Sequence, residues 1–247
     1  MTKDKRKTVC VLGHEGFIGS ALTRELLKTG EVTHFPSEKC RVIYDFASPT
    51  HEGFDANVDY NFNTIIPRMA YLMRYCADHN IKYVYPSSAL VYELDRPFKA
   101  FKEITEKMQD IFPADSLALR IFPVYGVGEK RTVIYQWCMD ILAGRQPTVF
   151  GDGTQIRDFI YIDDVISNIL KLSKTKTGFV DIGPGKPHTF NKIIALINKE
   201  AKTNIKPKYV KEPNVYSKGI FCKNPVPCIV SLREGIRKVL ASQGYQL

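Results

Sequence analysis

Three glycines at regular spacing form the first group of residues whose types and positions could do chemistry. Gly13, Gly16 and Gly19 follow the apolar, β-branched run 8–12 and open a segment with helical periodicity. In such a place the first glycine allows a tight turn, the second lets a pyrophosphate approach the backbone, and the third lets the helix pack closely on the strand. Because a helix N-terminus attracts anions, the loop predicts a dinucleotide-binding site. An ordinary strand-to-helix turn is the alternative.

The elements needed to position this loop alternate along the chain. Apolar runs predict buried strands at 8–12, 31–35, 41–46, 81–85 and 117–122, and helical spacing predicts helices at 17–28, 57–79, 97–112, 163–172, 189–202 and 231–241. Strands that alternate with helices are typical of a parallel sheet flanked by helices. We therefore expect an α/β fold: a shortened, Rossmann-type, doubly wound parallel sheet and a small C-terminal α/β substrate-binding region. The expected domains are a dinucleotide-binding domain at 1–125 and a mainly substrate-binding region at 126–247, from which some segments return to the sheet.

Composition excludes several classes of protein. With 247 residues, 44% hydrophobic and 25% charged, the chain has the averages of a globular protein. It holds no apolar run of the roughly 18 residues that a membrane helix needs, so we expect no membrane association. The six cysteines form no CxxC pair, which argues against structural zinc. The charged start leads directly into a strand-like run, which predicts a cytoplasmic protein without a signal peptide.

Charge is distributed unevenly along the chain. Residues 1–170 hold 20 lysines and arginines against 22 acidic residues, whereas residues 171–247 hold 15 against 4. A basic C-terminal region could serve nucleic acid, an anionic small molecule or only a solvated surface. Because the lysines are dispersed and lack interleaved aromatic residues, we do not expect nucleic acid as a partner.

Several further motifs, in chain order, resemble the extended short-chain dehydrogenase/reductase family of nucleotide-sugar epimerases, dehydratases and reductases. The spacing of the glycine loop is G-x-x-G-x-x-G, as in that family. The other similar segments are Phe46-Ala47-Ser48-Pro49, Asn63-Thr64, 85–92 (YPSSALVY), 119–126 (LRIFPVYG) and 151–165 (GDGTQIRDFIYIDDV). The resemblance implies an NADP- or NAD-dependent enzyme that acts on a nucleotide-diphosphate sugar. It also implies a homodimer formed through the helices at 57–79 and 97–112.

The resemblance implies a catalytic tyrosine and lysine four residues apart on one helix, with a serine on the preceding strand end. Lys102 matches the lysine and Ser88 matches the serine, but Phe98 occupies the tyrosine position. Phenylalanine has no proton to give, and loss of a general acid or base typically costs about 10²–10⁴-fold in rate. Three interpretations are open: an engineered tyrosine-to-phenylalanine substitution that traps a bound substrate, a pseudoenzyme, or another proton-carrying group such as Tyr92 or a water.

The type of reaction follows from two further positions. Dehydratases of the family carry Asp-Glu after the strand-end serine or threonine, and this chain has Ala89 and Leu90 there. The cysteine that GDP-fucose synthases have at the position of Ala89 is also absent. A 4-ketoreductase or a C4 epimerase remains, with a catalytically inactive nucleotide-sugar or dinucleotide-binding protein as the alternative.

The resemblance also implies which residues contact the ligands. Those expected to bind the coenzyme are Gly13, Gly16, Phe17, Ile18, Gly19, Ser37, Ala47, Ser48, Asn63, Lys102 and Pro123. Ser88 and Arg157 are expected to bind the substrate, since a guanidinium suits a diphosphate. A surface ion pair with Asp158 is the alternative for Arg157. After the second strand, Ser37, Lys39 and Arg41 favour NADP, whereas Glu38 favours NAD.

Overall fold

The computed structural model describes residues 8–93, 97–212 and 219–245, with residues 51 and 52 described by their backbone alone. The chain divides into two compact units. The first comprises Met1–Ile121 and Ile169–Val180, and the second comprises Phe122–Asn168 and Asp181–Leu247. The first segment of the first unit therefore ends at Ile121, whereas we predicted a domain boundary between residues 125 and 126.

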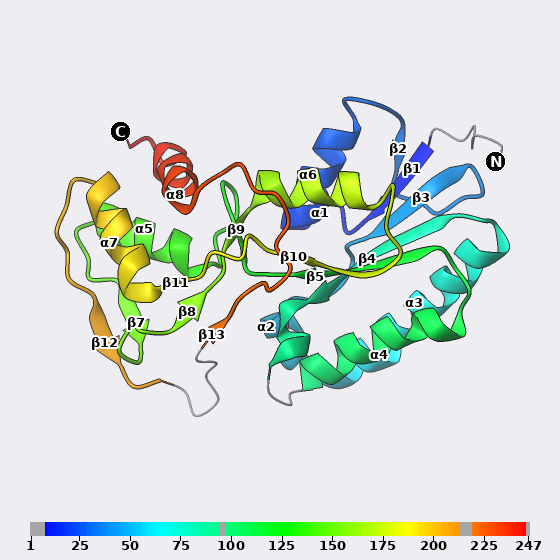
Figure 1. Cartoon of the computed structure of the whole chain (residues 1–247), viewed down its shortest axis with the longest axis horizontal. Coiled ribbons are helices and arrows are strands. Elements are labelled where there is room, and N and C mark those ends of the chain that lie inside the picture. The colour runs from blue at the N-terminus through cyan, green and yellow to red at the C-terminus, as the bar shows by residue number, and fades with distance from the viewer. Residues whose placement is uncertain (1–7, 94–96, 213–218, 246–247) are drawn as a thin grey trace. The chain divides into compact units, whose positions relative to one another are not determined.

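A six-stranded sheet forms the centre of the first unit. Its strands lie in the order β10-β5-β4-β3-β1-β2 (Figure 1). Their bounds are Gly178–Ile182 (β10), Ser116–Ile121 (β5), Lys82–Ser88 (β4), Cys40–Asp45 (β3), Thr8–Leu12 (β1) and Val32–Thr33 (β2). The pairs β1/β2, β1/β3, β3/β4 and β4/β5 are parallel. The predicted α/β fold with a Rossmann-type sheet is confirmed.

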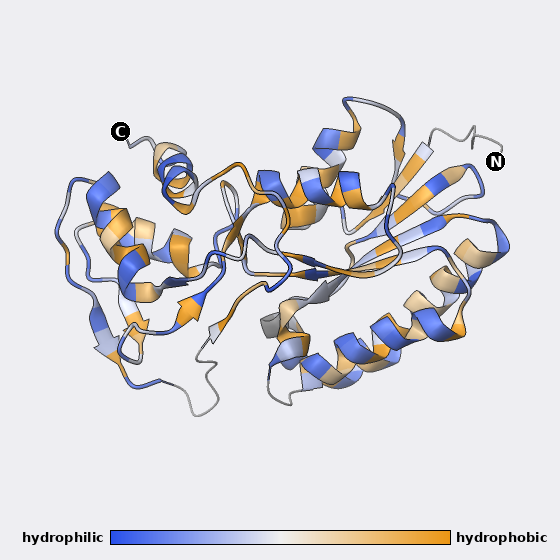
Figure 2. Ribbon diagram, in the orientation of Figure 1, coloured by the Kyte–Doolittle hydropathy of each residue, from blue (hydrophilic) through white to orange (hydrophobic). Residues whose placement is uncertain are grey.

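Helices cover both faces of this sheet. Helix α1 (Phe17–Leu26) lies on one face, and α3 (Val58–Asp78) and α4 (Pro97–Ile111) lie on the other (Figure 1). Two short helices, α2 (His51–Asp55) and the 3₁₀-helix η1 (Ala89–Tyr92), lie near the start of α3 and the end of β4. Hydrophobic and hydrophilic residues alternate along α3 and α4 (Figure 2), as expected for helices that bury one face.

The core between the sheet and α3 contains aromatic residues and thiols. Tyr83, Tyr85, Met73 and Cys76 are completely buried, and Cys10 and Cys40 belong to the same cluster. Burial raises the pKa of Cys76 to about 12, so this thiol stays protonated and unreactive near neutral pH. All six cysteines of the chain are free.

The second unit holds three helices and several short strands. Helices α5 (Val133–Leu142), α7 (Phe190–Glu200) and α8 (Leu232–Ala241) contact one another. Strand β8 (Ile156–Arg157) lies between β11 (His188–Thr189) and β13 (Gly219–Ile220). The remaining pairs are β7 (Thr148–Phe150) with β12 (Lys208–Val210) and β6 (Val124–Tyr125) with β9 (Ile160–Tyr161). Helix α6 (Ile162–Leu172) runs from this unit into the first.

Some element predictions were wrong. The strand expected at 31–35 has only two paired residues, because the chain turns away after Thr33. Helix α5 was not predicted, although its buried residues Ile134, Trp137, Cys138 and Ile141 recur at helical spacing. Within the described residues, no helix has the length and apolar character needed to cross a membrane.

Candidate functional site

The glycine loop connects β1 to α1 by a tight turn against the next strand end. Gly13 has φ +71°, and a Cβ there would lie 2.4 Å from the carbonyl carbon of Phe46. A Cβ at Gly19 would lie 2.1 Å from the carbonyl oxygen of Gly13. Only glycine fits either position. Gly16 precedes α1 and supplies no side-chain cap to the helix N-terminus, which leaves the first-turn N–H groups for an anion. Phe17 and Ile18 begin the helix at this point.

Asp45, at the end of β3, fixes the segment that the glycine loop touches. Its buried carboxylate accepts a hydrogen bond of 2.6 Å from the Tyr83 hydroxyl and lies 2.9 Å from the Arg68 guanidinium. The same guanidinium donates to the carbonyl of Ala47 at 2.8 Å, and the Ala47 N–H donates to Asp45 at 3.2 Å. Sequence reasoning missed Asp45, Arg68 and Tyr83. Their role depends on three elements that only the fold brings together.

Lys102 lies on α4 and reaches the ends of two strands. Its Nζ donates to Ser48 Oγ at 2.8 Å and to the carbonyl of Pro86 at 3.0 Å. The residue is only 3% exposed, and burial lowers the pKa of its amine to about 7 although Asp45 and Glu106 oppose the shift. Of the predicted site residues, the structure thus brings Lys102 and Ser48 together, beside the Ala47 backbone that Gly13 approaches.

Phe98 lies one helical turn before Lys102 and is buried in an aromatic cluster. Its ring meets Phe54 edge-on at 5.5 Å between centroids, and Phe101 belongs to the same cluster. The Lys102 Nζ lies 5.3 Å from the centroids of both Phe98 and Phe101. The surroundings of the Lys102 amine are therefore largely apolar on the α4 side.

Ser88 and its neighbours end β4 with two different polar contacts. Ser88 Oγ accepts from the Leu90 N–H at 3.2 Å and so caps the 3₁₀-helix η1. Ser87 Oγ donates instead to Glu106 at 2.5 Å. Glu106 also binds the Arg120 guanidinium through two hydrogen bonds of 2.9 and 2.6 Å. This ion pair was not predicted, because its two members lie on different elements, α4 and β5, and only the fold brings them together.

Arg120 connects the end of β5 to an exposed tyrosine. Its Nη1 donates to the Tyr92 hydroxyl at 2.8 Å, and its guanidinium lies 3.7 Å from the ring centroid of Phe179. The hydrogen bond to Glu106 raises the pKa of Arg120 further above its usual value. Tyr92, one of the groups that could replace the missing tyrosine, is therefore engaged with a permanent cation.

His34, directly after β2, stacks on His14 of the glycine loop, a contact that was not predicted from the sequence. The rings of His14 and His34 are stacked, with 3.6 Å between centroids and 18° between planes. His34 Nδ1 lies 3.1 Å from the carbonyl of Val11. Ser37 contacts the thiol of Cys40 at 3.5 Å. Asn63 is exposed on α3, and no hydrogen bond among the described residues joins it to this group.

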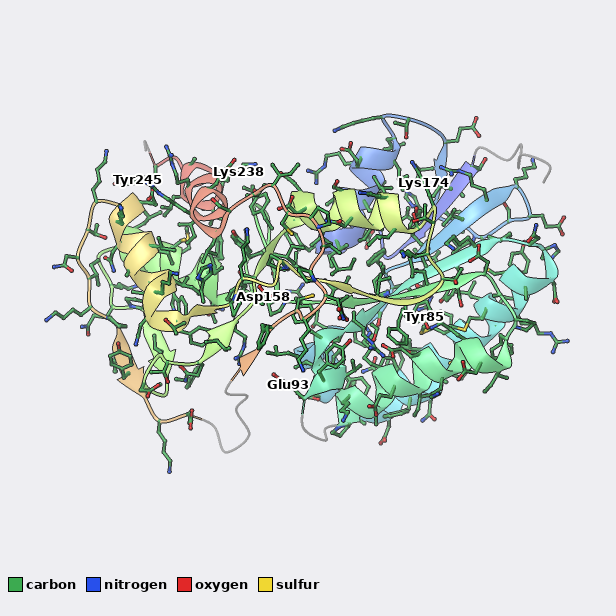
Figure 3. The ribbon with its side chains drawn as sticks, viewed as in Figure 1. Tyr85, Glu93, Asp158, Lys174, Lys238 and Tyr245 are labelled. Carbon is green, nitrogen blue, oxygen red and sulfur yellow. The ribbon has the colours of Figure 1, made fainter. Side chains whose placement is uncertain are left out.

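Pro123 and Arg157 belong to the second unit. The Pro123 carbonyl accepts from the Ile160 N–H at 3.0 Å. Arg157 is half-buried on β8, with its guanidinium carbon 5.5 Å from the ring centroid of Phe190. The neighbouring Asp158 is completely buried and accepts three backbone N–H groups at 2.9 Å, from Gly185, Lys186 and Cys222 (Figure 3). Asp158 thus holds loops of this unit together.

The described part of the chain shows no cluster of metal ligands. No group of three or more His, Cys, Asp or Glu side chains within these residues could hold a metal ion. The sheet edge therefore combines a glycine loop that can hold an anion with the buried amine of Lys102 and the half-buried hydroxyl of Ser48.

Comparisons with known proteins agree with this arrangement. A model described as "NAD dependent epimerase/dehydratase family" matches residues 99–183. The chain is 34% identical over 117 residues to UDP-glucuronate 4-epimerase of Thermodesulfobacterium geofontis, which covers 43% of this chain and 36% of that protein. It is 28% identical over 150 residues to ADP-L-glycero-D-manno-heptose-6-epimerase of Alkalilimnicola ehrlichii, which covers 49% of this chain and 47% of that protein. The matches thus span less than half the length of these two relatives.

Solved structures share the fold along nearly the whole chain. UDP-N-acetylglucosamine 4-epimerase from Methanobrevibacter ruminantium M1 superposes with a TM-score of 0.83 at 23% identity, covering 97% of this chain and 98% of that one. A tyrosine-to-phenylalanine variant of UDP-glucuronic acid 4-epimerase from Bacillus cereus, solved with a fluorinated UDP-sugar and NAD, gives 0.81 at 21% identity, covering 96% and 100%. The resemblance drawn from the motifs is confirmed. Residues 99–183 thus match the NAD dependent epimerase/dehydratase family that the motifs indicated.

Proposed function

We propose that the chain is an NAD(P)-dependent oxidoreductase of nucleotide-linked sugars, a C4 epimerase or a 4-ketoreductase. The observation that carries the proposal is the buried Lys102 amine, which bridges Ser48 and Pro86 at the same sheet edge as the glycine loop. The geometry at Gly13 and Gly19, where a Cβ would collide with backbone atoms, supports a dinucleotide pyrophosphate on the N-terminus of α1.

The residues of this edge have separate tasks in the proposed reaction. When bound, the nicotinamide ring would accept or return a hydride at a sugar carbon. The N–H groups at the start of α1 would hold the pyrophosphate, and Lys102 together with Ser48 would hold a ribose hydroxyl. Asp45 and Arg68 fix the backbone of Ala47, which keeps Ser48 in reach of Lys102. NAD is the favoured coenzyme because the matched family is described as NAD dependent.

The substrate class rests on the relatives and on charge. The epimerases matched above act on UDP- and ADP-linked sugars by their names. Residues 171–247 hold 15 basic and 4 acidic residues, and this positive charge favours a dianionic substrate. We assign Arg157 to the diphosphate of that substrate. We also propose a homodimer that forms through α3 and α4. We further propose a cytoplasmic location, which is consistent with the free cysteines.

A binding protein without turnover is the second candidate. It is favoured by one observation, the buried phenyl ring of Phe98 at the position where the resemblance implies a tyrosine. Such a protein would keep the glycine loop and the lysine and would bind the same ligands.

Calorimetry followed by product analysis tests the proposal. The chain is titrated with NAD and with NADP, and then, with the coenzyme bound, with UDP-glucose, UDP-glucuronic acid and an ADP-linked heptose. We expect micromolar-to-millimolar binding of a dinucleotide and of at least one sugar nucleotide, and epimerised or reduced sugar by proton NMR. If neither dinucleotide binds at millimolar concentration, the proposal fails. Binding of both ligands without any change in the sugar would favour the second candidate.

A further inference from the structure

Oxidation of a sugar hydroxyl to a carbonyl releases a proton as well as a hydride, so a group at the site must take that proton. The phenyl ring of Phe98 has no titratable atom. The inference below rests on the proposed function and concerns which side chain fills this role.

Most titratable groups at the sheet edge are already committed. The Asp45 carboxylate is held by Tyr83 and Arg68, and the Glu106 carboxylate is held by Arg120 and Ser87. Each carboxylate is therefore already bound by a guanidinium and a hydroxyl of the fold.

The tyrosines near the site are committed in a similar way. The Tyr85 hydroxyl is buried between the sheet and α4 and donates to the carbonyl of Thr105 at 3.0 Å (Figure 3). Burial raises the pKa of Tyr85. Burial together with Asp45 raises the pKa of Tyr83 well above its usual value. Tyr92 differs from these two, because it is 52% exposed and its hydroxyl accepts a hydrogen bond from the permanent cation of Arg120.

Lys102 differs from all of these groups. Within the described residues its Nζ makes two hydrogen bonds, to Ser48 and Pro86, and has no carboxylate at ion-pair distance. An ammonium offers three donors, whereas a neutral amine offers two donors and one lone pair. As an ammonium, Nζ donates to Ser48 Oγ and to the Pro86 carbonyl, as observed. As a neutral amine it could keep one N–H on Pro86 and turn its lone pair to the Ser48 hydroxyl.

We propose that Lys102 Nζ, linked to the Ser48 hydroxyl, carries the catalytic proton of this chain in place of a tyrosine. In the oxidative direction the sugar C–H bond would break, and its electron pair would leave as hydride, for which a bound, oxidised nicotinamide dinucleotide would be the acceptor. The sugar O–H bond breaks at the same carbon, and its proton passes to Ser48 Oγ. Ser48 in turn gives its own proton to Nζ, so that a carbonyl and an ammonium result. In the reductive direction the hydride would return to the sugar carbon and the proton to the sugar oxygen.

The surroundings of Lys102 suit this exchange. The rings of Phe98 and Phe101 exclude water from the α4 side, and Ser48 is only half-buried, so it forms the accessible end of the pair. The charged groups that act on Nζ are Asp45 from β3 and Glu106 from α4, and both favour the ammonium. Their effect is smaller than that of burial, which leaves both protonation states within reach near neutral pH.

The first test measures the titration of Lys102 directly and needs no turnover. The full chain is labelled with ¹⁵N-lysine, and the Nζ resonance of Lys102 is assigned by its loss in Lys102→Met. We expect a midpoint close to pH 7. A midpoint of Lys102 above 9 overturns the inference and leaves the proposed function standing, because binding of the two ligands is measured separately by calorimetry.

The second test separates proton transfer from ribose binding. Lys102→Arg keeps a cation but cannot accept a proton. If Lys102 carries the proton, this change lowers kcat by roughly 10²–10⁴-fold with little change in the coenzyme KM, and the loss becomes much smaller in a Phe98→Tyr background. Equal losses in both backgrounds would mean that Lys102 only positions the coenzyme, which contradicts the inference. Lys107→Arg is the matched control for the substitution itself. If the unaltered chain binds both ligands but does not turn over the sugar nucleotide, the inference about Lys102 is also overturned.

Discussion

The two glycines at positions 13 and 144 allow a controlled test of the anion cradle. Both have nearly the same strained conformation, φ +71° at Gly13 and +72° at Gly144. A Cβ at Gly13 would lie 2.4 Å from Phe46, whereas a Cβ at Gly144 would meet nothing within 4 Å. Alanine at the two positions therefore imposes the same backbone strain but very different contacts.

The magnitudes follow from these contacts. Alanine in the left-handed conformation costs roughly 1–2 kcal/mol, and the stiffer unfolded chain returns about 0.4–1 kcal/mol. Gly144→Ala should then lower the free energy of unfolding by about 0–1.5 kcal/mol. Gly13→Ala adds a collision with backbone, for which overpacking costs of roughly 1–3 kcal/mol are typical. Its total should be about 1–4.5 kcal/mol.

Urea denaturation followed by far-UV circular dichroism measures both losses, and calorimetry measures dinucleotide affinity. We expect Gly144→Ala to bind the dinucleotide like the unaltered chain. Gly13→Ala should bind at least tenfold more weakly, because the loop has to move away from the Ala47 backbone. Equal destabilisation by the two changes, or unaltered affinity in a folded Gly13→Ala, would refute the assignment of this loop.

Three further outcomes follow from the same edge of the sheet. Because the pKa of Lys102 is lowered to about 7 in the folded chain, the unfolded chain binds more protons between about pH 7 and 10, so stability rises with pH across this window. Lys102→Met should flatten that rise in denaturation curves recorded at several pH values, and an unchanged slope would contradict the shift. Glu106→Gln should lower the free energy of unfolding by about 3–5 kcal/mol, because it leaves the nearly buried Arg120 guanidinium without its ionic partner. A decrease below 1 kcal/mol in urea titration would exclude a structural role for this ion pair. His34→Asp should shift the ratio of NAD to NADP affinity towards NAD, because a carboxylate repels a 2′-phosphate, and calorimetry showing an unchanged ratio would place the adenosine end elsewhere.

Residues with local roles were predictable from the sequence. The glycine spacing indicated both the turn at Gly13 and the close helix packing at Gly19, because each depends on the absence of a Cβ within a short stretch of chain. The pairing of Lys102 with Ser48 was less accessible. Both residues were predicted as coenzyme-binding by resemblance, but 54 positions separate them and nothing in the sequence indicates their 2.8 Å contact.

Other residues escaped prediction because their roles depend on distant partners. Asp45 lies at the end of an apolar strand, so the sequence gives it no separate role. Its contacts with Tyr83 and Arg68 are evident only in the folded chain. His14 and His34 are 20 positions apart, and only the return of the chain along β2 stacks their rings. Where a side chain is fixed by partners on other strands, single-sequence periodicity carries no information about it.

The sequence alone indicated the class of fold and the resemblance to a family, because alternating strands and helices and a series of ordered motifs are local patterns. It also determined that position 98 carries no hydroxyl. The tertiary structure alone decided that Lys102 is buried with a hydroxyl and a carbonyl as its partners. Burial removes water that would otherwise solvate the ammonium, and no stretch of sequence records how much water the folded chain excludes.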